Sequence, residues 1–412
     1  MSRRRFLLNS AKAAGLALIS QVLSSRKAEA AQWKKLQAGA ASGGTARTIT
    51  IYAWGDNTCG QLGDGTTNTI NTPVAVCGLS GCNVISVAAG TFHSLALLGN
   101  GCVMAWGNNS CGSLGDGTVT ARCTPVMVCG ISTAVSINTN GDTSYAILSN
   151  GSIMSWGVCD YGQLGNNCAT GHTSSPVLVC CISTAIAMKA NTVLLNNGCL
   201  MSWGFNYSGD VGINSSNAFG GIWVPNSVCC ISTAVAVNGS TAILADGTMK
   251  RWGANDEGEL GNGNITCSTT PVGVCGISNA IAMANAAGGI HAVLANGCVM
   301  AWGWGGNGRL GNNAIVNKCC PIAVCCISTA VAIAGDNYSA HALLRDGTLR
   351  AWGSYNSLGS NPGTADKSKP VAVCCISNAY ATVAVSSRKG RPAAGVRIID
   401  GGGYHKIFLH LG

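Results

Sequence analysis

Cysteine is the residue with the most chemistry to offer in this sequence, because a thiolate can bind a metal, attack an electrophile or form a disulfide. The 412-residue chain holds 23 cysteines. Seven recur at intervals of roughly 50 residues: Cys77, Cys129, Cys180, Cys229, Cys275, Cys325 and Cys374. A second cysteine directly follows four of them, at Cys181, Cys230, Cys326 and Cys375. Since the total is odd, at least one thiol is free or bonds another chain.

The spacing of these cysteines argues against a zinc ribbon or a haem attachment site. No C-x-x-C pair stands beside a second such pair, and no C-x-x-C-H motif occurs. Disulfides are the usual use of so many cysteines in an exported chain. Equivalent positions of neighbouring repeats lie too far apart for a disulfide, so we expect pairing within a repeat or between different positions. Buried apolar thiols, metal ligation and a redox role stay open as alternatives.

Other chemistry-bearing residues show no catalytic pattern. The six histidines do not cluster, and no nucleophile elbow, P-loop, HExxH motif or carboxylate pair appears. We therefore predict a protein that is not an enzyme and that needs no cofactor. A metal ion bound by cysteines is the one exception that stays open.

A repeat of about 50 residues must position these side chains. Trp-Gly dipeptides mark it at Trp54, Trp106, Trp156, Trp203, Trp252, Trp302 and Trp352. Short apolar runs alternate with Asn-Gly or Asp-Gly pairs, as at Asn100-Gly101 and Asp246-Gly247, which favour tight type I′ hairpins. Each period is therefore predicted to be a small unit of short strands. The regular tryptophans are expected to pack in the core rather than to stack on a ligand.

The loop after each Trp-Gly pair resembles a known family. Residues 54–65 look like the W-G-x-N-x-x-G-Q-L-G-x-G signature of the regulator of chromosome condensation repeat. The pattern returns at 106–117, 156–165 and 252–263, and in weaker form at Trp203, Trp302 and Trp352. The resemblance covers residues 47–412 and implies an all-β, seven-bladed β-propeller.

The chain ends suggest how such a ring closes. Residues 399–409 mirror residues 87–97 and stop where a Trp-containing strand should follow, and residues 48–54 supply that strand. We expect the N- and C-terminal strands to pair in a shared blade, which removes exposed sheet edges.

The first 30 residues are typical of an export signal. A basic start precedes the apolar residues 13–23 and the small residues flanking Glu29. Residues 2–7, Ser-Arg-Arg-Arg-Phe-Leu, resemble the twin-arginine motif, which implies a prokaryotic protein exported already folded. We predict a signal peptide over 1–30, a linker over 31–46 and the propeller over 47–412. An ordinary secretory signal and an uncleaved anchor are alternatives.

Charge and hydropathy indicate which partners and which location to expect for the mature protein. The whole chain has a net charge of +9, to which the first 30 residues contribute +5 through six bases and one acid. Residues 48–385 hold ten bases and thirteen acids, a net charge of −3. A nucleic-acid surface would concentrate positive charge, so no nucleic-acid partner is expected. No later segment has about 18 consecutive apolar residues, so no membrane span is expected in the mature chain. The periplasm, the cell surface or the medium is the predicted location.

Departures from the repeat are the candidate contacts for a partner. They are the aromatic residues Phe205, Tyr207, Phe219, Trp223, Trp304 and Tyr355, and the basic residues Arg388, Lys389 and Arg391. Exposed aromatics anchor protein interfaces, although local loop packing would explain the same residues. The basic segment is a solvated loop or a contact for an acidic partner.

These observations favour an exported, non-catalytic interaction module that binds a protein through its loops. A cell-envelope structural protein, crosslinked into a covalent oligomer through an unpaired cysteine, is one alternative. A cysteine-rich, metal-binding envelope protein is another. The resemblance also brings members that exchange nucleotide on a small nuclear GTPase and dock on nucleosomes, and secreted bacterial members that inhibit β-lactamases. A nucleotide-exchange-like effector is the remotest of these possibilities.

Overall fold

The computed structural model describes residues 49–168, 171–215, 220–286, 288–335, 339–354, 366–373, 396–399 and 405–411. In these residues the chain is β-structure, apart from loops and one 3-10 turn, Gly306–Gly308. The predicted all-β class is confirmed. No helix in this described part is long and apolar enough to cross a membrane.

Six four-stranded antiparallel sheets, here called blades, are each built from consecutive strands. The first two are β3 (Val84–Ala89), β4 (His93–Leu98), β5 (Val103–Gly107) and β6 (Arg122–Met127), then β7 (Ala134–Asn140), β8 (Thr143–Leu148), β9 (Ile153–Val158) and β10 (His172–Leu178). The next two are β11 (Ala185–Lys189), β12 (Thr192–Leu195), β13 (Leu200–Phe205) and β14 (Gly221–Ser227), then β15 (Ala234–Val237), β16 (Thr241–Leu244), β17 (Met249–Gly253) and β18 (Ser268–Gly273). The last two are β19 (Ala280–Ala286), β20 (Gly289–Leu294), β21 (Val299–Gly303) and β22 (Lys318–Ala323), then β23 (Ala330–Gly335), β24 (Ser339–Leu344), β25 (Leu349–Gly353) and β26 (Lys367–Ala372).

A further sheet combines strands from the two ends of the chain. Its order is β2 (Ile70–Ala75), β1 (Ile49–Gly55), β28 (His405–Leu411) and β27 (Val396–Ile399). Strand β1 pairs antiparallel with β28, with Ile49 opposite Leu411 and Gly55 opposite His405.

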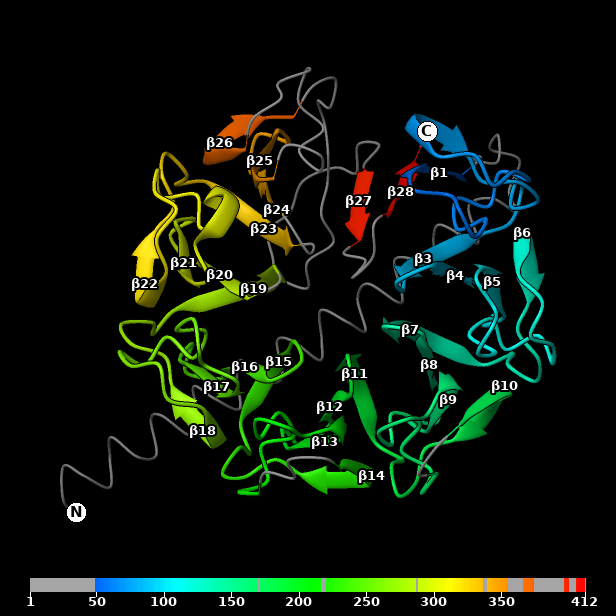
Figure 1. Ribbon diagram of the computed structural model, residues 1–412, viewed down its shortest axis with the longest axis horizontal. Helices are drawn as coiled ribbons and strands as arrows, with labels where there is room; N and C mark the ends of the chain where they lie inside the picture. The colour runs from blue at the N-terminus through cyan, green and yellow to red at the C-terminus, as the bar shows by residue number, and fades with distance from the viewer. Residues whose placement is uncertain are drawn as a thin grey trace, which may run out of the picture.

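The blades lie around a common centre, with the first strand of each innermost and the fourth outermost (Figure 1). The outermost strand is the edge where proline costs no ladder hydrogen bond. Prolines accordingly stand in the outer strands, at Pro125, Pro176, Pro225, Pro271, Pro321 and Pro370. Apolar side chains fill the spaces between neighbouring blades: Leu95 and Val103 of one pack with Ala146 and Trp156 of the next.

The buried tryptophans join each blade to the one before it. The indole N–H of Trp156 donates to the carbonyl of Ser113 at 2.9 Å, and that of Trp252 donates to Asp210 at 2.9 Å. The same bond recurs at 2.8–2.9 Å for Trp106 to Gln61, Trp203 to Gln163, Trp302 to Glu259 and Trp352 to Arg309. These six rings are at most 1% exposed. Each one therefore packs in the core and also satisfies a loop carbonyl of its neighbour.

The hairpins between the second and third strands are not the expected type I′ turns. At residues 98–102 the Gly101 N–H donates to Leu98, and only Gly101 (φ 86°) has a positive φ. The Asn100 carboxamide accepts from the Cys102 N–H at 3.0 Å. This is a type I turn closed by a glycine bulge. The prediction was wrong because the Asn or Asp side chain bonds the backbone two residues on, while glycine alone takes the left-handed position.

Candidate functional site

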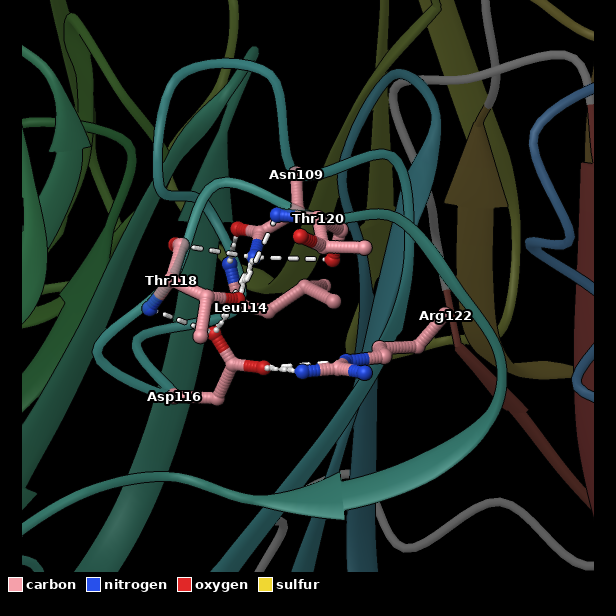
Figure 2. Close-up of polar contacts among 6 residues, drawn as sticks. All are labelled: Asn109, Leu114, Asp116, Thr118, Thr120 and Arg122. Atoms are coloured by element: carbon pink, nitrogen blue, oxygen red, sulfur yellow. Dashed lines mark hydrogen bonds and ion pairs between the residues drawn. The ribbon is translucent and has the colours of Figure 1, made fainter.

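The loop that joins the third strand of a blade to its fourth, here called the outer loop, carries the site. Antiparallel order places all outer loops on one face of the blades, together with the loops from first to second strand. In the β3–β6 blade the fully buried Asn109 organises this loop. Its Oδ1 accepts from the Leu114 N–H at 2.9 Å, and its Nδ2 donates to the carbonyls of Thr118 (3.0 Å) and Thr120 (3.1 Å) (Figure 2).

Asp116 adds charge to the same loop. It accepts from Asn109 Nδ2 at 3.1 Å and forms an ion pair with Arg122, also at 3.1 Å (Figure 2). Desolvation pushes the pKa of Asp116 upward, but hydrogen bonds from Thr118, Arg122 and Asn109 outweigh it, so the pKa is lowered. These contacts join Asn109, Asp116 and Arg122 into a hydrogen-bonded frame that closes the outer loop.

Four aromatic side chains gather where the β7–β10 and β11–β14 blades meet; we call them the aromatic patch. They are Tyr161, Phe205, Tyr207 and Trp223, which are 44%, 49%, 57% and 36% exposed. The Tyr161 and Phe205 rings meet edge to face, with centroids 5.3 Å apart. The Phe205 and Tyr207 rings are nearly parallel at 6.2 Å. The structure therefore brings three predicted contacts, Phe205, Tyr207 and Trp223, into the same region.

Glycines allow the two blades to approach at this patch. A Cβ on Gly221 would stand 1.8 Å from the Tyr161 carbonyl oxygen, and one on Gly162 would stand 2.9 Å from the Trp223 ring. The Asn167 N–H also donates to the Trp223 carbonyl at 3.0 Å. Strand β14 thus lies directly against the outer loop that presents Tyr161.

Sequence reasoning missed Tyr161. Its position in the repeat, just before the Gly that begins the G-Q-L-G segment, holds Cys59, Cys111, Ser208, Glu257 and Asn307 in other blades. An aromatic residue at a position that is not aromatic in these other blades was the signal that could have identified Tyr161 as a candidate contact.

Trp304 lies in the outer loop of the β19–β22 blade, separated from the patch by the β15–β18 blade. It is 37% exposed, and the guanidinium carbon of the fully buried Arg309 lies 3.7 Å from the centre of its ring. Arg309 Nε also donates to the Gly306 carbonyl at 3.0 Å. Trp304 therefore covers a buried cation. Of the other predicted contacts, Phe219, Tyr355, Arg388, Lys389 and Arg391 lie outside the described residues.

The registered cysteines hold their loops through the backbone. The Cys77 N–H donates to Gly63, and the Cys275 N–H donates to Gly261 at 2.9 Å. Cys77, Cys129 and Cys275 are exposed, and Cys180, Cys229 and Cys325 are half-buried, so burial as small apolar residues does not describe these six. Cys374 lies outside the described residues. The following residue takes a positive φ whether it is glycine, as at Gly276 (68°), or cysteine, as at Cys230 (55°).

Several titratable groups of the described part are buried or lie beside one another. His93 Nε2 lies 2.8 Å from Ser144 Oγ, but both side chains are fully buried, and Ser144 donates its own proton to the Ser113 carbonyl. Desolvation raises the pKa of Cys320, helped by the nearby thiols of Cys275 and Cys319. Across the described residues no three His, Cys, Asp or Glu side chains are grouped to hold a metal ion.

Comparison with known proteins agrees with this geometry. The family description of the regulator of chromosome condensation repeat matches residues 50–97 and again residues 84–113. Human E3 ubiquitin-protein ligase HERC2 is 37% identical over 81 residues, which are 20% of this chain and 2% of that protein. Human Protein RCC2 is 43% identical over 70 residues, 17% of this chain and 13% of that protein. The matched segment thus spans a small part of these relatives.

Solved structures show the same fold over most of the chain. Saccharomyces cerevisiae Prp20p, the yeast RCC1, superposes with a TM-score of 0.71 at 17% identity, covering 89% of this chain and 92% of that one. Human WBSCR16 superposes with a TM-score of 0.70 at 18% identity, covering 88% and 99%. Residues 50–113 therefore match the regulator of chromosome condensation repeat, and most of the chain has the propeller fold of these solved structures.

Proposed function

We propose that this protein is an exported, non-catalytic interaction module that binds a protein partner through the aromatic patch. The observation that carries the proposal is the grouping of Tyr161, Phe205, Tyr207 and Trp223, each more than a third exposed, at one blade junction. Tyrosine, tryptophan and phenylalanine are enriched in the energetic centres of protein interfaces. The partner surface that fits is apolar, with hydrogen-bonding groups for the two tyrosine hydroxyls.

The frame behind the patch supports this use. The Trp203 indole N–H donates to the Gln163 carbonyl, and the fully buried Asn206 fixes the loop that carries Tyr207. Aromatic anchors held on rigid loops lose little conformational entropy on binding. We also propose that seven blades form a closed ring, a proposal supported by the pairing of β1 with β28.

Export is supported by residues 1–30, with their basic start, apolar stretch and twin-arginine-like motif. Sequencing the N-terminus of the protein recovered from the periplasm or medium tests it. A mature chain that begins near residue 31 is expected, and recovery of the full-length chain from the cytosol alone would contradict export.

A photo-crosslinking experiment tests the binding surface. A benzophenone amino acid is placed at Tyr207 and, as a matched control, at Ile265, which is 65% exposed in the outer loop of the next blade. We expect one crosslinked protein at position 207 that is absent at 265, and its loss when Phe205→Ser is added. The same crosslinked proteins at both positions, or none at 207, would refute the patch as the binding surface.

A covalent envelope protein is a second candidate, favoured by the exposed thiols of Cys77, Cys129, Cys181 and Cys230. Electrophoresis of freshly exported protein with and without reductant distinguishes the two. A ladder that collapses on reduction supports the crosslinked form, whereas a monomer in both lanes excludes it.

A further inference from the structure

One residue type closes the outer loop in most blades. Asn57, Asn109, Asn206 and Asn255 are all fully buried. In each case Oδ1 accepts from the N–H five residues on, at 2.8–3.0 Å. Nδ2 donates to the carbonyl nine residues on, at 2.8–3.1 Å.

The β7–β10 blade has a cysteine, Cys159, at this position. Cys159 is 0% exposed, and its Sγ donates to the Cys168 carbonyl, nine residues on, at 3.0 Å. The backbone of Leu164, five residues on, lies close enough to the same thiol to lower its pKa. The thiol thus takes over the contact that the asparagine of other blades makes with the carbonyl nine residues on.

The residue nine positions on is also a cysteine, and the repeat explains why the two side chains meet. In other blades the side chain at that position touches the asparagine: Thr66 Oγ1 and Thr118 Oγ1 lie 3.3 Å from Nδ2, and Asn264 Oδ1 lies 3.2 Å from it. In this blade Cys159 Sγ lies 3.0 Å from the Cys168 carbonyl, so the side chain of Cys168 starts from a residue already in contact with the thiol. Cys168 also contributes to the raised pKa of Cys159.

We propose that Cys159 and Cys168 are a disulfide-forming pair, in which a covalent bond closes the outer loop where other blades use an asparagine. The bond would span the segment that carries Tyr161, so it would also fix one member of the aromatic patch. The pairing itself does not depend on the proposed binding function.

The chemistry needs an oxidant of the disulfide class, either a small-molecule disulfide or the disulfide of an oxidoreductase. Cys168 is partly exposed, so its thiolate attacks the oxidant, forms a mixed disulfide and releases one thiolate. Cys159 then loses its proton and attacks Cys168 Sγ, which releases the second thiolate. The pair gives up two electrons and two protons, which leave as two thiols of the oxidant.

The buried position of Cys159 sets the order of these steps. Desolvation first, then the hydrogen bond and nearby thiol of Cys168, raise the pKa of Cys159 to about 12. A thiol of that kind is a poor first nucleophile at neutral pH. The bond is therefore expected to form as the loop folds or opens, with Cys168 reacting first.

Peptide mapping of the full-length protein tests the pairing. The protein is equilibrated with a glutathione redox buffer, alkylated and cleaved with chymotrypsin, which separates peptides 157–161 and 165–178, each with one cysteine. We expect these two peptides to be joined, and to separate on reduction. Cys168 joined to a different cysteine, or both thiols alkylated after oxidation, would overturn the proposal.

A double variant that copies the β3–β6 blade, Cys159→Asn with Cys168→Thr, keeps the loop contacts and removes the bond. Hydrogen exchange at the Leu164 amide should slow on oxidation of the wild type by up to about a hundredfold, because crosslinking a loop of about ten residues removes closure entropy. The double variant should exchange equally in both buffers. The proposal would also be overturned if the Leu164 amide of the wild type exchanged at the same rate in oxidising and reducing buffer.

Discussion

Replacing Asn109 by aspartate tests whether the buried amide holds the outer loop. The two side chains have the same shape, and the new carboxylate can still accept from the Leu114 N–H. It cannot donate to the carbonyls of Thr118 and Thr120, and it would face Asp116, whose Oδ1 lies 3.1 Å from Asn109 Nδ2. The two carbonyls, on the half-buried Thr118 and the exposed Thr120, would lose their donor, and the new carboxylate would itself be buried without a donor for its second oxygen; together these losses cost about 1–3 kcal/mol for each buried group left unpaired.

The cost should depend on pH in a defined direction. Burial and Asp116 raise the pKa of the introduced carboxyl in the folded state above its unfolded value of about 3.9. The folded variant then binds more protons than the unfolded chain, so its stability falls as pH rises through the folded pKa. We expect a loss of about 3 kcal/mol at pH 5 and about 5 kcal/mol at pH 8.

Denaturant unfolding of the variant and the wild type between pH 5 and pH 8, followed by tryptophan fluorescence, measures both quantities. Asn255→Asp is the matched control, since Asn255 Nδ2 donates to Asn264 and Thr266 and to no carboxylate. The Asn255→Asp variant should lose a similar amount of unfolding free energy at pH 5, and its stability should change less between pH 5 and pH 8. An Asn109→Asp variant as stable as the wild type, or one that gains stability with rising pH, would refute the argument.

Two further substitutions follow from the backbone and from burial. Cys230→Gly should raise the free energy of unfolding by about 0.5–1 kcal/mol, because Cys230 holds φ 55° where Gly276 stands in another blade, and Gly276→Ala should lower it by about 1 kcal/mol in the same denaturant assay. Desolvation lowers the pKa of the buried His291 from 6.5 to about 4. Between these pH values only the unfolded chain takes up the proton, so the free energy of unfolding of the wild type should fall by about 3 kcal/mol as pH falls from 6.5 to 4. His291→Gln should flatten that part of the stability profile, and an unchanged slope would show that His291 is not its source.

Much of the scaffold was readable from sequence because it repeats. The Trp-Gly spacing gave the unit, and the buried rings of Trp156 and Trp252 stand where the repeat placed them. The hairpin type was not readable, because an Asn-Gly pair suits both a type I′ turn and a type I turn with a glycine bulge. Tyr161 was missed since its contact with Phe205 crosses between blades and depends on how closely Gly221 lets them approach.

Residues that depart from the repeat are of two kinds. Some replace a residue of the loop frame and keep its contacts, and others are exposed beside the frame and can change without disturbing it. Cys159 stands where other blades have asparagine, but it keeps the bond to the carbonyl nine residues on, at Cys168. Arg309 stands where the repeat has glutamine, and its carbonyl still accepts from the Trp352 indole at 2.9 Å. Trp304 covers that buried Arg309. These departures serve the frame. Phe205 and Tyr207 flank the frame-forming Asn206 without replacing it, so their exposed rings are not required for loop closure. Selection for a partner can therefore act on them at little cost to stability, which is why the aromatic patch is the surface to test first.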